Sequence, residues 1–170
     1  RGTRARWLDF ATKNVSIAFE SRLASQTGMV QRYRALEEAF GFDAQIQRME
    51  CFDISHTQGE LAVASCVVFD REGPSKQEYR KFNIEGITPG DDYAAMHQAL
   101  SRRYTRLKKG EGKMPDILFI DGGKGQLSQA ADVMEELQIT EVLLVGIAKG
   151  VERRPGMEQL FTVDSKQPIL

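Results

Sequence analysis

The sequence predicts an α/β fold in which helices cover a mixed β-sheet. Three strand-like segments follow one another between residues 49 and 84, and their short connections favour an antiparallel meander. Helical and strand-like segments then alternate from residue 91 to residue 148, a pattern typical of parallel strands joined by crossover helices. Together the two patterns predict a mixed sheet of five or six strands, meander first and parallel strands after it.

Before this sheet, residues 1–42 predict a helical extension that packs on the core. Apolar residues recur at helical spacing from Leu8 to Leu23 and again from Val30 to Phe40. A turn near residues 26–28 is expected between two helices, and Gly41 is suited to end the second helix. The chain therefore divides into an extension, residues 1–42, and an α/β domain, residues 43–170.

The elements of the α/β domain are predicted from apolar alternation, helical periodicity and turn residues. A helix should begin at Asp91 or Asp92, and a second helix should follow a glycine-rich loop near residue 122. Of the later strands, the fourth and fifth should be parallel, because one helix connects them. The strands are expected at residues 49–54, 61–69, 78–84, 116–120 and 142–148, with a sixth at 157–163.

Composition limits the partners and the location of the chain only loosely. The net charge of −1 neither indicates nor excludes a polyanionic partner. No apolar run is long enough to span a bilayer, and the start of the chain lacks the pattern of a signal peptide. Cys51 and Cys66 lie in apolar, strand-like runs, which indicates reduced thiols in a cytoplasmic protein with no membrane contact.

The glycine-rich loop, in the stretch FIDGGKGQ at residues 119–126, resembles a phosphate loop only superficially. Its glycines match neither the Walker spacing nor the G-x-G-x-x-G fingerprint. A tight turn from strand to helix, with close approach and positive φ at the glycines, accounts for the loop itself. It does not account for Asp121, because a carboxylate at the end of a buried strand is costly unless it is paired or bound to metal.

Asp53 and Asp92 are the predicted partners of Asp121. If the first and fourth strands are parallel neighbours, Asp53 and Asp121 meet at the same end of the sheet. Asp92 lies one helical turn before Met96 on the core-facing stripe, so its side chain should point toward the sheet, with Asp91 to one side. Three converging carboxylates repel one another unless a divalent cation lies between them, and all-oxygen ligands favour Mg²⁺ or Mn²⁺ over zinc.

Each carboxylate also has a simpler interpretation. Asp92 taken alone is more often a helix N-cap. Asp53 could cap the turn at Ser55 and His56, and Asp121 could accept hydrogen bonds from the glycine loop. His56 could only line the turn, and the mid-helix His97 is more often a solvated residue. The order of the elements, which brings the three aspartates together, makes metal binding the favoured hypothesis.

Three motifs resemble the C-terminal endonuclease domain of the UvrC excision-repair nuclease family: ECFDISHTQGELAVASCVVFD, ITPGDDYAAM and PDILFIDGGKGQLSQA. The resemblance implies an RNase H-like fold, with Asp53, Asp92 and Asp121 as catalytic residues and metal ligands. It implies Mg²⁺ or Mn²⁺ as cofactor and damaged double-stranded DNA as substrate, hydrolysed at one phosphodiester 5′ to the lesion. UvrB is the implied partner of the parent protein.

Several features of that family have no counterpart in these 170 residues. The family carries a further active-site histidine, a helix-hairpin-helix module, a GIY-YIG nuclease and a helical segment that binds UvrB. Neither His56 nor His97 matches the motif of that histidine. We therefore expect a fragment that binds metal but nicks DNA poorly. A catalytically incomplete module that docks DNA or a partner is the alternative.

Basic residues in two places are candidates for DNA contact. Lys124 and Gln126 begin a helix whose N-terminal amides favour a phosphate, and Lys149 is a weaker candidate. A cationic stripe on the preceding helix and loop could follow a DNA backbone, or it could be a solvated face. Its members are Arg102, Arg103, Arg106, Lys108, Lys109 and Lys113. A phosphoacceptor receiver domain would also place acids at strand ends, but it needs an all-parallel sheet, against which the meander counts.

Overall fold

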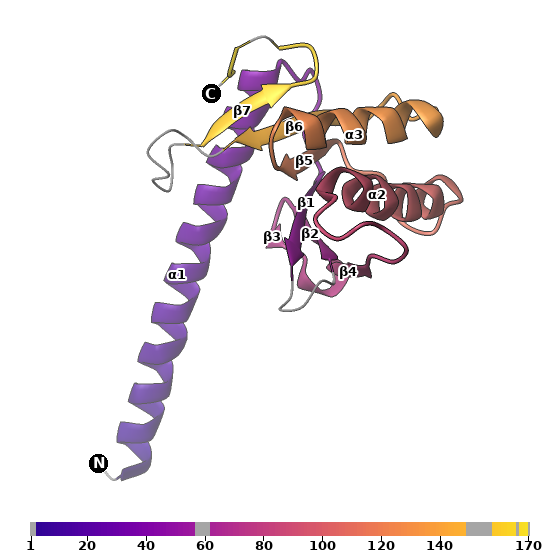
Figure 1. Ribbon diagram of the computed structural model, residues 1–170. Helices are drawn as coiled ribbons and strands as arrows, with labels where there is room; N and C mark the ends of the chain where they lie inside the picture. The colour runs from indigo at the N-terminus through magenta and orange to yellow at the C-terminus, as the bar shows by residue number, and fades with distance from the viewer. Residues whose placement is uncertain (1–2, 57–61, 149–157, 166, 170) are drawn as a thin grey trace.

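The computed structural model describes residues 3–56, 62–148, 158–165 and 167–169, without the side chains of residues 3–9. One sheet separates two helical layers: α2 and α3 cover one face, and the C-terminal part of α1 packs on the other (Figure 1). The helices are α1 (Thr3–Phe40), α2 (Asp92–Lys108) and α3 (Lys124–Glu136), with a 3₁₀ turn at Lys76–Glu78. The strands are β1 (Arg48–His56), β2 (Ala62–Asp70), β3 (Gly73–Pro74), β4 (Arg80–Asn83), β5 (Ile117–Asp121), β6 (Leu143–Ala148) and β7 (Gln159–Thr162).

The sheet is mixed, as predicted. Its strand order is β3-β2-β1-β5-β6-β7, with β4 also pairing to β2. β1 is antiparallel to β2, whereas β1, β5 and β6 run parallel to one another, and β7 is antiparallel to β6. The expected six strands are present among the described residues, and the two-residue β3 is added to them. The antiparallel β1–β2 pair excludes the all-parallel sheet of a receiver domain.

The N-terminal extension differs from the prediction of two helices. Residues 3–40 form one continuous helix that passes through Gly28 without a turn. It ends at Phe40 and is followed by Gly41, whose φ of 67° suits glycine. The amides of Gly41 and Phe42 donate back to the carbonyls of Glu38 and Glu37. The reason is that one glycine costs only about 1 kcal/mol in a helix, too little to break it.

Only the last third of α1 packs on the sheet. Tyr33 is 1% exposed and belongs to a cluster with Ile46, Met49, Ile117 and Val145. Further toward the N-terminus the helix runs away from the sheet (Figure 1). Apolar side chains on that part are open to solvent, at 61% exposure for Phe10. The exposed set is Phe10, Val15, Ile17, Phe19, Leu23 and Val30.

Strand alternation gives the two faces of the sheet different roles. Phe52, Leu118 and Ile120 belong to the main core with α2 and α3. Residues one position away point to the opposite face, where the α1 cluster lies. Asp53 and Asp121 follow Phe52 and Ile120, so both lie on the α1 side of the sheet. Asp121 is the last residue of β5, and Asp53 lies three residues before the end of β1. None of the described helices has the length and apolar character that a membrane crossing requires.

Candidate metal centre

Asp53 and Asp121 are directly paired in the structure. They are Cα partners in the parallel register of β1 and β5, whose backbones lie about 4.8 Å apart in a regular sheet. Asp53 is exposed and Asp121 is half-buried. Burial, and then the negative charges of Asp121 and Asp53, raises the pKa of the Cys51 thiol to about 12. Both carboxylates therefore act on the same strand face, and the predicted meeting of the first and fourth strands is confirmed.

Asp91 and Asp92 have the different roles that helical register predicted. Asp91 is the N-cap of α2, and its Oδ1 accepts a hydrogen bond from the Ala94 amide at 3.0 Å. Asp92 is the first helical residue, and its Oδ1 lies 2.7 Å from Nε2 of His56, the last residue of β1. The simpler interpretation of Asp92 as the cap is thus wrong, and its side chain reaches the sheet. Sequence reasoning missed His56, although alternation from Phe52 places it on the α2 face.

Two glycines of the loop let neighbouring side chains approach where a Cβ atom would otherwise stand. A Cβ on Gly122 would lie 1.4 Å from Oε1 of Gln126, and one on Gly125 would lie 2.3 Å from the Tyr93 hydroxyl. The expected positive φ is not found, because Gly123 has φ −71° and the positive-φ glycines lie elsewhere. Gln126 Oε1 is buried and has no hydrogen-bond partner among the described residues, so this side chain folds over the loop instead of facing solvent.

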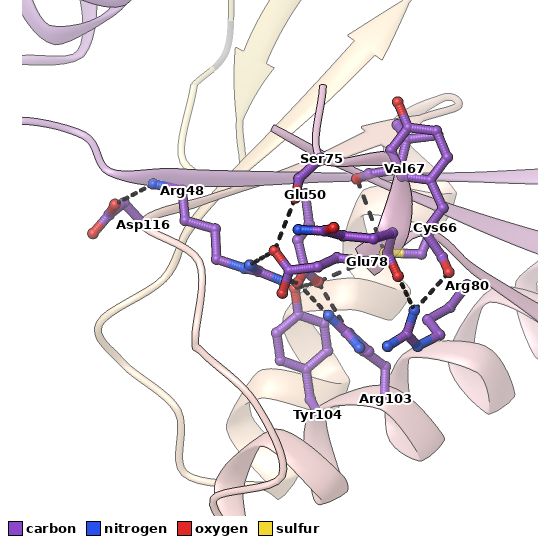
Figure 2. Close-up of polar contacts among 12 residues, drawn as sticks. Arg48, Glu50, Cys66, Val67, Ser75, Glu78, Arg80, Arg103, Tyr104 and Asp116 are labelled. Carbon is purple, nitrogen blue, oxygen red and sulfur yellow. Dashed lines mark hydrogen bonds and ion pairs between the residues drawn. The ribbon is translucent and has the colours of Figure 1, made fainter. Parts of the chain in front are cut away.

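Arg103 is not available for DNA, contrary to prediction. Its side chain is 11% exposed and makes an ion pair with Glu50 of β1, with Nη2 to Oε1 at 2.6 Å. Figure 2 shows Arg48 and Tyr104 converging on the same carboxylate, at 3.1 Å and 3.2 Å. Glu50 is fully buried, so the charge of Arg103 serves to neutralise it inside the core.

The other residues of the cationic stripe differ in their contacts and in their exposure. The Arg102 guanidinium donates to the Asn83 carbonyl at 2.8 Å and lies over the Phe82 ring. Lys108 donates to the Leu137 carbonyl. Arg106 is exposed but lies 14 residues beyond Asp92, about 21 Å along the helix axis. This end of α2 is therefore remote from the carboxylates.

Of the other predicted DNA contacts, Lys124 is exposed at the first position of α3. Its helix has Gly123 as N-cap, with no side chain capping the free amides. The partly buried side chain of Gln126 is directed back over Gly122. Lys149 lies outside the described residues.

The donor chemistry of the carboxylate pair fits a hard divalent cation. Mg²⁺ is usually held by one or two carboxylates together with water and substrate phosphates, and Asp53 with Asp121 supplies such a pair. In the part of the chain that the structure describes, no three His, Cys, Asp or Glu side chains gather closely enough to hold a metal ion by themselves. The described contact of the Asp92 carboxylate is with His56, and Asp92 does not form a ready-made cluster with the pair.

The chain is similar to a known protein family over most of its length. Residues 37–170 match the UvrC RNAse H endonuclease domain. "UvrABC system protein C" of Ectopseudomonas mendocina is 55% identical over 98% of this chain, and that of Pseudomonas putida strain W619 is 58% identical over 96%. The chain spans 27% of the length of either relative.

Solved structures show a more distant similarity. The catalytic domain of human Endonuclease V is 20% identical, with a TM-score of 0.47, covering 78% of this chain and 58% of that one. Human ENDOV itself is 23% identical, with a TM-score of 0.46, covering 62% of this chain and 47% of that one.

Proposed function

Because the chain belongs to the UvrC RNase H endonuclease domain family and has an RNase H-like fold, we propose that it is a metal-dependent DNA endonuclease of nucleotide excision repair. Its substrate is damaged double-stranded DNA, in which it hydrolyses one phosphodiester 5′ to the lesion. The observation that carries the proposal is the register pairing of Asp53 on β1 with Asp121 at the end of the parallel strand β5.

In this proposal three aspartates hold Mg²⁺ or Mn²⁺. Asp53, on a central strand, would hold the cations together with Asp121 and Asp92. Bound there, the cations would activate the attacking water and stabilise the leaving oxygen. Water attacks phosphorus opposite the 3′ oxygen, the P–O3′ bond breaks, and the products carry a 5′ phosphate and a 3′ hydroxyl.

The start of α3 is the proposed contact for a DNA phosphate. Lys124 is exposed there, and the uncapped amides at Gly123 present partial positive charge to an anion. Arg106 and Lys108 lie at the far end of α2, so they would meet DNA only well away from the cleaved bond. In the parent protein we expect UvrB as a partner through a segment outside these 170 residues, and a cytoplasmic location.

A melting experiment tests the metal site directly. Mn²⁺ should raise the melting temperature of the wild-type chain, because a ligand of the native state stabilises it by mass action. Asp53→Asn should remove most of this rise. Asp132→Asn, which changes an exposed carboxylate on the surface of α3, should leave the rise intact and serves as the matched control. An equal rise in wild type and Asp53→Asn would exclude Asp53 as a ligand.

Nicking of supercoiled plasmid in Mn²⁺, tested on the parent protein, separates an endonuclease from a docking module. Asp121→Asn should abolish nicking while DNA binding persists, because the carboxylate serves the reaction and contacts no phosphate. The docking alternative gains support from the absence of a three-residue cluster among the described side chains. DNA binding without nicking, in a wild-type protein that binds Mn²⁺, would favour that alternative.

A further inference from the structure

His56 occupies a position between two elements of the proposed site. It is the last residue of β1, three residues beyond Asp53, and its Nε2 lies 2.7 Å from Oδ1 of Asp92 on α2. Both side chains are partly open to solvent, at 45% and 40% exposure. The contact therefore ties the start of α2 to the strand that carries Asp53, at the edge where substrate would approach.

The ionised carboxylate determines which of the two side chains donates the hydrogen bond. A carboxylate can only accept a hydrogen bond, so Nε2 of His56 must carry the hydrogen and donate it. Oδ1 of Asp92 is then occupied, and Oδ2 stays available to another ligand. Metal-binding side chains commonly have such a second partner, which orients them and tunes their affinity.

Among the described residues, His56 is the hydrogen-bond partner of the Asp92 carboxylate. Asp91 already caps the helix through Ala94, and the contact with His56 is the side-chain hydrogen bond found for Asp92 among the described residues. Without His56, the Asp92 side chain would be free to leave its rotamer. The cost of re-ordering it would then weaken binding of any ion that it completes.

We propose that His56 is a positioning residue that holds Asp92 in the orientation in which it binds the divalent cation. The inference rests on the proposed function and deepens it, because it adds a residue that touches neither the ion nor the DNA. Loss of such a partner typically lowers metal affinity about 10–100-fold.

The chain provides a matched control. His97 lies on α2, its Nε2 is 3.2 Å from Oε1 of Glu136, and its side chain is 35% exposed. It makes the same kind of histidine–carboxylate contact, but its partner is on α3 and is no proposed ligand. Replacing either histidine with alanine removes the same groups, so only the position differs.

The experiment measures Mn²⁺ affinity by calorimetric titration for wild type, His56→Ala, His56→Gln, His97→Ala and Asp53→Asn. The melting temperature of each variant without metal is recorded beside it, so that a loss of fold is separated from a loss of binding. The Gln variant keeps a side-chain N–H near the position of Nε2. It therefore tests the hydrogen bond and not the ring.

We expect His56→Ala to weaken Mn²⁺ binding about 10–100-fold, His56→Gln to recover much of the loss, and His97→Ala to match wild type. Unchanged or tighter binding in His56→Ala overturns the inference, as does a His56→Gln variant no better than His56→Ala. If wild type shows no binding that depends on Asp53, the proposed metal site fails and this inference fails with it. Binding that depends on Asp53 but not on His56 overturns the inference alone.

Discussion

Replacing Arg103 with methionine should destabilise the chain without any effect specific to DNA. Arg103 donates to both oxygens of Glu50, at 2.6 Å and 3.3 Å, and Glu50 has no exposed surface. Methionine fills much of the space of the arginine stem but leaves that carboxylate short of a cation. Removing one partner from a buried ion pair costs about 3–5 kcal/mol.

The network around Glu50 sets where in this range the loss should fall. Arg48 and Tyr104 still contact the carboxylate after the substitution, so we expect the lower end, about 3 kcal/mol. For a domain of this size, each kcal/mol lowers the melting temperature by about 2–4 °C, which gives a decrease of about 6–12 °C.

Thermal melting without DNA is the assay, and Arg106→Met is the control. Arg106 lies on the same helix and is exposed, so its replacement should change stability by no more than about 0.5 kcal/mol. DNA binding measured well below the melting temperature should keep the same salt dependence in Arg103→Met, because no phosphate contact is lost. Wild-type stability together with a reduced salt dependence would refute the reasoning and restore Arg103 as a DNA contact.

Other predictions concern residues outside this pair. Asp91→Ala should lower stability by about 0.5–2 kcal/mol through loss of the N-cap but keep the Mn²⁺ response. Asp92→Asn should keep the stability but lose cleavage in the parent protein. Equal losses of cleavage in the two variants would contradict the different roles that helical register gives to Asp91 and Asp92. The hydrogen bond from Arg48 holds the pKa of Glu78 below 4.5. The stabilisation from the ionised Glu78 is therefore present above that pH and is lost as the pH falls through the lowered value. In urea unfolding, Glu78→Gln should lose less stability than wild type between about pH 7 and about pH 3. Burial raises the pKa of the Cys66 thiol, so alkylation should be slow in the native chain and fast in denaturant; rapid native labelling would contradict its burial.

The pairing of Asp53 and Asp121 was predictable because a meander followed by alternating helices and strands favours a sheet in which the first and fourth predicted strands are parallel neighbours. Arg103 was misjudged as part of a cationic stripe, although its position showed otherwise. It follows Met96 and Leu100 by seven and three residues, and so lies on the buried face of α2. A buried arginine requires a buried acid, and Glu50 inside an apolar strand was that signal.

The contact between His56 and Asp92 could not be derived in the same way. It depends on how far α2 lies from the end of β1, which tertiary packing decides. The continuity of α1 was also missed, because residues 26–28 contain turn-forming residue types that a helix nevertheless tolerates at small cost.

The unsupported part of α1 has a consequence for hydrogen exchange. The helix is about 57 Å long at 1.5 Å per residue, yet its tertiary contacts are concentrated around Tyr33. A helix without tertiary contacts is only marginally stable in water. Amide protection along α1 should therefore rise in a gradient, from rapid exchange near Phe10 to exchange by global unfolding near Tyr33. The helix is one element by geometry but spans a wide range of local unfolding free energies.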